Sequence, residues 1–137
     1  MQQLNFIKVG GGIGKMQEHY GHTAAVQIDN IIKISGQGGW DKDFNFPHKE
    51  LKNEIKQALD NVAFVLETAG SSWAKVYSVT SYFTDKITDE MHEVMVDYFR
   101  KNCDNLPIWT TVQVAGLGNP NMHVEIVVEA IKNRLNK

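Results

Sequence analysis

Residues 49–84, KELKNEIKQALDNVAFVLETAGSSWAKVYSVTSYFT, change from a helical to an extended hydrophobic pattern within one segment. Between residues 49 and 69 apolar side chains recur every three or four positions, as they do along one face of an amphipathic helix. Lys52, Glu54, Lys56 and Asp60 are expected to face away from the core. Gly70 then suits the end of the helix. Residues 76–84 are rich in β-branched and aromatic side chains, which is typical of a strand.

The segments on either side repeat these two patterns. Asp29-Asn30 separates two short apolar runs and suits a tight hairpin, and Thr88 is a suitable N-cap for a second helix. Residues 10–16 are glycine-rich but lack the spacing of a phosphate-binding loop, so we expect a plain loop there. The other predicted elements are a helix at residues 89–102 and strands at 24–28, 31–34, 109–115 and 123–131, with a further short apolar run at 6–9.

This order of elements predicts an α+β fold, in which helices pack on one face of a mixed sheet. The chain has no internal repeat and no linker rich in Pro, Gly or Ser, so residues 1–137 are expected to form one domain. The opposite face of the sheet would be bare. A partner usually covers such a face in a domain of this size, and a closed homo-oligomer is the simplest arrangement.

The composition is that of an ordinary globular protein, with 42% hydrophobic and 22% charged residues. Fourteen basic and sixteen acidic side chains give a net charge of -2, which argues against a nucleic-acid partner. The only cysteine, Cys103, cannot form an internal disulfide, which fits a reducing compartment. Without a recognisable secretion signal or a run approaching 18 apolar residues, a cytoplasmic protein with no membrane partner is expected.

Three motifs resemble those of a known family. They are ISGQ at residues 34–37, PIWTTVQV at 107–114 and VEI at 124–126. With AGSS at 69–72 and SYFTD at 81–85, they make the chain resemble the Rid/YjgF family, named for the reactive intermediate deaminases and formerly called L-PSP endoribonucleases. The resemblance extends from about residue 21 to residue 131.

The resemblance implies a chorismate-mutase-like fold, with two helices on one face of a mixed sheet and three copies assembled as a homotrimer. Small-molecule pockets would lie at the subunit interfaces. Active family members hydrolyse reactive enamines and imines derived from amino acids, releasing ammonia and a keto acid without a metal or an organic cofactor. We therefore expect a small-molecule ligand and no cofactor. His19, His22 and His123 also lack the spacing typical of a metal site.

The resemblance assigns candidate pocket residues in distant parts of the chain. Ser35 and Gly36 match a serine–glycine pair at the end of a hairpin strand. Ser35 would orient the substrate as a hydrogen-bond donor, and Gly36 would let the backbone approach a ligand or turn sharply. His22 stands where a tyrosine is frequent and His92 where an asparagine is frequent. Either histidine would move protons near neutral pH.

A carboxylate on the last predicted strand matches the family glutamate thought to hold the attacking water. Glu125 occupies this position, with Glu129 as the rival alignment. Strand alternation puts both on the face opposite to that of Val124, Ile126 and Val128. If the carboxylate is half-buried, its pKa is raised, which suits a general base that activates water.

Trp109 stands where deaminating members carry the arginine that clamps the substrate carboxylate. An indole has one N–H and no charge, so it cannot replace two parallel charge-assisted hydrogen bonds. Each such bond contributes about 1.5–3 kcal/mol, so the usual imino acids should bind roughly tenfold to several thousandfold more weakly. Trp109 instead offers a flat face to an aromatic, apolar or cationic ligand. Backbone amides near Thr110 and Thr111 would hold its polar end.

The first functional hypothesis is a homotrimeric enzyme that hydrolyses a reactive enamine, imine or related metabolite other than the usual imino acids. The predicted catalytic residues are Glu125, Ser35 and His92, and the predicted substrate-binding residues are His22, Gly36, Trp109, Thr110 and Thr111. The alternative is a non-catalytic binding or regulatory trimer, in which Trp109 stacks on an aromatic metabolite. An endoribonuclease ranks third, because the charge balance offers phosphates little attraction.

Overall fold

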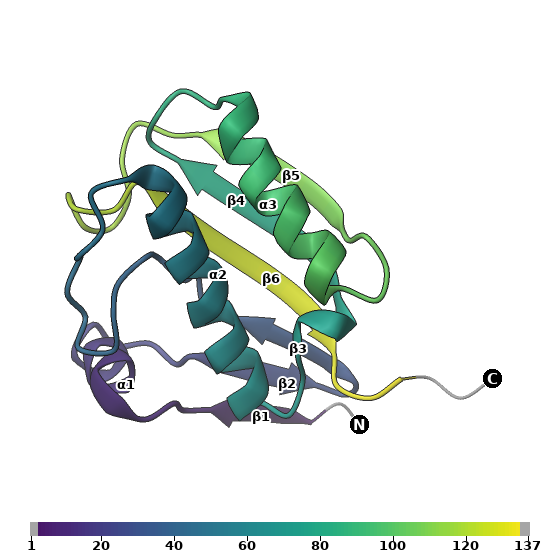
Figure 1. Ribbon diagram of the computed structural model, residues 1–137. Helices are drawn as coiled ribbons and strands as arrows, with labels where there is room; N and C mark the ends of the chain where they lie inside the picture. The colour runs from purple at the N-terminus through teal and green to yellow at the C-terminus, as the bar shows by residue number, and fades with distance from the viewer. Residues whose placement is uncertain (1–2, 135–137) are drawn as a thin grey trace.

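The computed structural model, which describes residues 3–134, contains a six-stranded mixed sheet with two long helices along one face (Figure 1). The strand order is β1-β2-β3-β6-β4-β5, and only β4 and β5 run parallel. This arrangement confirms the predicted α+β fold. The elements are β1 (Leu4–Ile7), α1 (Gly11–His19), β2 (Ala25–Ile28), β3 (Ile31–Ile34), α2 (Leu51–Thr68), a 3₁₀ turn (Trp73–Lys75), β4 (Val76–Phe83), α3 (Asp89–Asn102), β5 (Ile108–Gln113) and β6 (Val124–Ile131).

Helix α2 packs on the sheet through the apolar face that its spacing predicts. It lies mainly against β6, whose core-facing side chains alternate with more exposed ones. Burial of each Leu, Ile or Val side chain at this contact contributes about 1.5–3 kcal/mol. Gly70 follows the helix with a φ of +83°, as expected for the residue that ends it. The α2 side chains with no exposed surface include Ile55, Leu59, Val62 and Leu66.

Helix α3 starts at the predicted cap. The Oγ1 atom of Thr88 accepts a hydrogen bond from the backbone N–H of Met91 (3.3 Å), and acidic residues occupy the first turn, where the helix dipole favours them. Buried methionine and phenylalanine side chains line the inner face of α3, which packs beside α2. The two predicted helices therefore form one layer.

Residues 10–16 were expected to form a plain loop, and this prediction is wrong because α1 begins at Gly11. Glycine disfavours a helix by about 1 kcal/mol relative to alanine, so local propensity argues against α1. Close packing explains its glycines: a Cβ atom on Gly12 would collide with the carbonyl oxygen of Lys42. Burial of Ile13 adds a hydrophobic contact. Contacts with distant residues therefore override the local preference.

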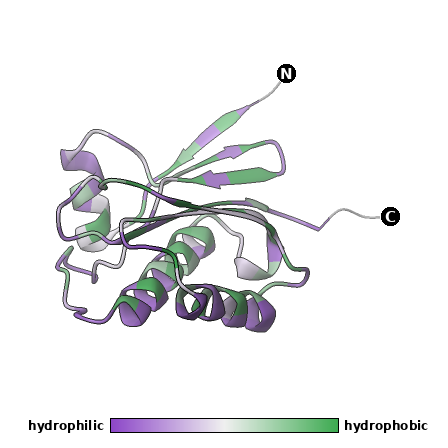
Figure 2. Cartoon of the chain, turned by 90° about the horizontal axis from the view of Figure 1, so that it is seen from above, coloured by the Kyte–Doolittle hydropathy of each residue, from purple (hydrophilic) through white to green (hydrophobic). Residues whose placement is uncertain are grey.

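The sheet face opposite α2 and α3 is rich in apolar side chains that remain exposed in the single chain. Figure 2 shows both long helices on the same side of the sheet. On the other side, Phe6 of β1 and Ile108 of β5 are 63% and 72% exposed. Apolar patches of this kind on a soluble protein mark interaction surfaces. No helix among residues 3–134 is long and apolar enough to cross a bilayer.

Candidate functional site

A pocket of about 270 Å³ lies where β3 and β6 meet α1 and two loops. Four of the predicted site residues, which are distant in sequence, line it together: His22, Ser35, Gly36 and Glu125. The remaining lining residues are supplied by α1 and the loops. They are Met16, Tyr20, Trp40, Phe44, Gly118, Asn119 and Met122.

Gly36 makes room for the Glu125 side chain. Gln37 and Ile126 exchange two backbone hydrogen bonds of 2.9 Å, which hold the chain after β3 against β6. A Cβ atom on Gly36 would lie 2.7 Å from Cδ and 2.8 Å from Oε1 of Glu125, closer than non-bonded atoms approach. Gly36 was expected to let the backbone approach a ligand closely. In the structure the group that lies this close to Gly36 is the Glu125 carboxyl group.

Glu125 is half-buried and projects from the opposite side of β6 to the core residues. Burial raises the pKa of its carboxyl group above the ordinary value, because the charged form loses hydration. The neighbouring His22 opposes this shift, because its protonated ring favours the carboxylate. The net result is a more basic carboxylate, which is better suited to accept a proton from water.

The Ser35 hydroxyl is oriented by the chain that precedes β2. Its Oγ atom donates a hydrogen bond to the carbonyl oxygen of Thr23 (2.6 Å) and lies 3.5 Å from Nδ1 of His22. The hydroxyl proton is thus engaged, while the lone pairs of Oγ remain available to an N–H group. In this geometry Ser35 is suited to accept a hydrogen bond from a ligand, whereas the sequence suggested a donor.

His92, Trp109 and Thr111 lie together in a second cluster. The indole N–H of Trp109 donates to Oγ of Ser81 (2.9 Å), which in turn donates to Oγ1 of Thr111 (2.9 Å). The His92 ring meets the indole edge-to-face with the ring centroids 5.3 Å apart. Ser81 is fully buried and was not predicted. Its only sequence signal is a hydroxyl at a core-facing position of a strand.

The two clusters lie on opposite faces of the sheet, with β4 between their strands. Glu125 pairs in register with Tyr82 on the face not covered by α2 and α3. Trp109 pairs with Val79, which is buried on the helix side, whereas the exposed Thr110 alternates to the other side. Trp109 and Glu125 of one protomer therefore cannot meet, and a site containing both needs a second copy of the chain.

Glu129, the rival to Glu125, has different surroundings. Its Oε1 atom accepts a hydrogen bond from the Tyr77 hydroxyl (3.2 Å) and lies 4.0 Å from Nζ of Lys33. It is not among the described residues that line the pocket. Of the two carboxylates, Glu125 alone accompanies Ser35 and His22.

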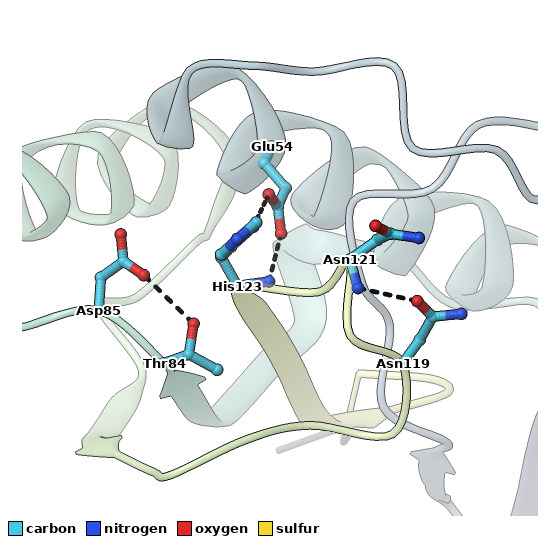
Figure 3. A network of polar contacts seen from close by, with 6 residues as sticks. All are labelled: Glu54, Thr84, Asp85, Asn119, Asn121 and His123. Atoms are coloured by element: carbon cyan, nitrogen blue, oxygen red, sulfur yellow. Dashed lines mark hydrogen bonds and ion pairs between the residues drawn. The ribbon is translucent and has the colours of Figure 1, made fainter.

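Glu54 holds the start of β6 in place (Figure 3). It was expected to face away from the core, but it is only 4% exposed, so this prediction is wrong. Its carboxylate accepts hydrogen bonds from the backbone N–H (2.7 Å) and ring Nδ1 (2.8 Å) of His123. The helical pattern grouped Glu54 with the polar residues that face away, because its contact with a residue 69 positions later could not be inferred locally.

Replacing Glu54 by alanine should reduce the free energy of unfolding by about 1–3 kcal/mol, because His123 loses two hydrogen bonds to a buried carboxylate. Urea denaturation monitored by circular dichroism measures this change. Lys56→Ala, at an exposed position of the same helix, is the control and should change stability by less than about 0.5 kcal/mol. Equal stability of the two variants would contradict the role assigned to Glu54.

Within residues 3–134, no group of three or more His, Cys, Asp or Glu side chains is arranged to hold a metal ion. Nδ1 of His123 is engaged by Glu54. Burial, with a smaller contribution from Asp104, raises the pKa of the Cys103 thiol to about 11, so this thiol is a poor nucleophile at neutral pH.

Comparison with known proteins identifies similar sequences over almost the whole chain. The family model described as Endoribonuclease L-PSP matches residues 15–132. A RutC family protein of Aquifex aeolicus is 34% identical over 112 residues, covering 81% of this chain and 88% of the relative. The human 2-iminobutanoate/2-iminopropanoate deaminase is 32% identical over 135 residues, covering 96% of this chain and 90% of the relative.

Solved structures share the same fold. Yeast Mmf1 superimposes with a TM-score of 0.79 at 20% identity, covering 96% of this chain and all of that chain. A member of the YjgF/YER057c/UK114 family from Mycobacterium tuberculosis has a TM-score of 0.75 at 24% identity, covering 94% of this chain and 99% of that chain. The solved structures agree in fold, and the sequence matches show that the chain belongs to the Rid/YjgF family.

Proposed function

We propose that this protein hydrolyses a reactive imine or enamine, and that Glu125 holds and activates the water. The supporting observation is the half-buried Glu125 carboxyl group, whose raised pKa suits a general base and which lies over Gly36 beside Ser35 and His22. The human, rat and mouse relatives named 2-iminobutanoate/2-iminopropanoate deaminase support this class of reaction.

Each residue has a step in the proposed reaction. Glu125 accepts a proton as the water oxygen bonds to the imine carbon, and the C=N electron pair moves to nitrogen. Ser35 accepts a hydrogen bond from the substrate N–H, and His22 or His92 supplies a proton to nitrogen. Glu125 then returns its proton to nitrogen, the C–N bond breaks with its electron pair moving to nitrogen, and the hydroxyl group loses its proton to the histidine, so that ammonia leaves and a carbonyl group forms. A general base in such a step contributes about 10²–10⁴-fold to the rate.

The proposed assembly is a homotrimer with its ligand sites between subunits. Two observations support it: the apolar sheet face opposite α2 and α3, and the position of Trp109 and Glu125 on opposite faces of one sheet. Because β5 is the edge strand of the sheet, residues on both of its faces lie at that edge, and the β5 edge of a neighbouring copy would bring Trp109, Thr110 and Thr111, with His92 beside them, to the pocket. We place the trimer in the cytoplasm, because its single cysteine suits a reducing compartment.

The proposed substrate differs from the usual imino acids because of Trp109. Its indole N–H already donates to Ser81, so the side chain has no donor left for a carboxylate. The ring can instead contact an apolar or aromatic group.

The proposed reaction is tested by ammonia release from freshly generated 2-aminoacrylate and 2-iminopropanoate, measured against a buffer blank. Acceleration of either supports the hydrolase. No acceleration removes only these two carboxylate-bearing substrates. If a carboxylate-free imine is not accelerated either, the second candidate is favoured, a non-catalytic binding or regulatory trimer, which the apolar lining of the pocket also suits. A ribonuclease has less support, because the net charge of -2 attracts phosphates weakly, and salt-sensitive RNA binding would be needed to revive it.

Gly36→Ala should reduce hydrolysis by roughly tenfold or more with little loss of stability. The added methyl group would displace the flexible end of Glu125, which moves at low cost but no longer holds the water in position. Initial rates and thermal unfolding of the same preparation separate the two effects. Gly116→Ala is the matched control, because a Cβ atom there would meet no atom within 4 Å and the residue does not line the pocket. Unchanged rates in Gly36→Ala would refute this role of the glycine.

A further inference from the structure

The pocket beside Glu125 has an apolar wall that the proposed chemistry does not use. Its polar side chains are His22 from the chain before β2, Ser35 from the end of β3, Glu125 from β6 and Asn119 from the loop before β6. Its apolar side chains come from α1 and the loops: Met16, Tyr20, Trp40, Phe44 and Met122. The pocket volume of about 270 Å³ equals that of about nine molecules of liquid water. This space fits a small metabolite with one ring.

The charges in the pocket do not favour an anion. None of its described lining residues is a lysine or an arginine, and Glu125 is the only carboxylate. The second cluster, built from Ser81, His92, Trp109 and Thr111, also contains neither lysine nor arginine. A substrate carboxylate would meet a like charge and no permanent cation, which disfavours its binding. A neutral substrate avoids this cost.

Phe44 is held in a backbone conformation that bulky residues rarely adopt. Its φ is +61°, in the left-handed region, where glycine or asparagine is less strained. Asp41 maintains the turn, because its Oδ1 atom accepts hydrogen bonds from the backbone N–H groups of Asp43 (2.9 Å) and Asn45 (2.8 Å). Backbone strain of this kind is concentrated at active sites and ligand-binding sites, where the surrounding structure holds it in place.

The turn places the Phe44 ring against Trp40, with the ring centroids 5.0 Å apart and the planes tilted by 44°. Phe46 supports both rings at centroid distances of 5.5 and 6.5 Å but does not line the pocket. Trp40 is buried, whereas Phe44 remains partly exposed. An aromatic surface is thus prepared beside the carboxylate that activates water.

We propose, building on the imine hydrolysis argued above, that the site takes a carboxylate-free imine whose aromatic substituent lies against Trp40 and Phe44. Water adds to the imine carbon, the C=N electron pair moves to nitrogen, and C–N cleavage releases ammonia and an aromatic aldehyde or ketone. No oxidant or reductant is consumed. Because such imines arise when primary amines are oxidised, the reaction that supplies the substrate is an amine oxidation.

Binding is tested first, with stable analogues and isothermal titration calorimetry. Benzamide is the neutral analogue of an aromatic imine, benzoate carries the disfavoured charge, and acetamide lacks the ring. Benzamide should bind at least about tenfold more tightly than either. Phe44→Ala should weaken benzamide binding about tenfold and leave acetamide binding unchanged. Equal affinity for benzamide and benzoate would overturn the proposal.

Two further variants separate recognition from folding. Phe44→Asn suits the left-handed backbone, so it should fold even if Phe44→Ala does not, and it should lose the preference for benzamide. Phe46→Leu loosens the same aromatic cluster without changing the pocket lining and should keep that preference. If both variants lose it equally, Phe44 has only a packing role and the proposal is wrong.

Catalysis is tested with benzaldimine, generated from benzylamine by an amine oxidase, beside 2-iminopropanoate generated from alanine. Faster ammonia release from benzaldimine, reduced about tenfold by Phe44→Asn, supports the proposed substrate class. Faster release from 2-iminopropanoate alone overturns that class and leaves imine hydrolysis standing. Selective benzamide binding without acceleration of either imine refutes the hydrolase and supports the aromatic site as a binding site only.

Discussion

Glu125→Gln should lower kcat/KM for imine hydrolysis by about 10²–10⁴-fold without changing the fold. Glutamine keeps the size of the side chain but cannot accept a proton from water, so only base catalysis is removed. Ammonia release under steady-state conditions measures the loss, and circular dichroism verifies the fold. Glu129→Gln is the matched control, since it removes a carboxylate from the same face of β6 outside the pocket. Equal losses in the two variants would refute the assignment.

The pH dependence provides a second test of Glu125. Burial raises the pKa of its carboxyl group, and only the carboxylate accepts a proton, so the parent rate should rise with pH through this elevated pKa. This rise of the rate with pH should be absent in Glu125→Gln and retained in Glu129→Gln. If the rate of Glu125→Gln still rose with pH in the same range, another titrating group would cause the rise, and Glu125 would not be the base.

Val127→Asp should convert the proposed trimer into a monomer and abolish hydrolysis. Val127 lies on β6 opposite Thr80, near the middle of the sheet face that α2 and α3 leave uncovered. A carboxylate buried there without a partner costs several kcal/mol per subunit. Sedimentation equilibrium should therefore report a mass near 15.5 kDa for the variant and about three times this mass for the parent.

Two controls make the assembly test decisive. Val127→Thr introduces a polar group of similar size without a charge and should remain largely trimeric. Lys56→Glu changes the charge on an exposed position of α2, on the opposite layer, and should leave assembly unaltered. If Val127→Asp remained trimeric and active, this face would not be the interface. The proposal that Trp109 of one copy and Glu125 of another form one site would then be wrong.

Most secondary structure could be predicted because its signals are local. The spacing of Ile55, Leu59, Val62 and Leu66 describes one helix face whatever that face contacts, and all four are buried in the structure. The Thr88 cap acts within one helical turn. Helix α1 was missed for the converse reason, since its stability depends on packing against distant backbone rather than on its own residues.

Most residues of the candidate site could be predicted from the sequence, because the motifs around Ser35 and Glu125 resemble those of the Rid/YjgF family. The contacts that these residues make could not be predicted. The burial of Glu54, the proton of Ser35 directed at Thr23 and the engagement of Trp109 by Ser81 are contacts between segments far apart in the chain. Sequence patterns report periodicity over a few residues, whereas hydrogen-bond direction and the face on which a side chain lies depend on how the strands are ordered in the sheet.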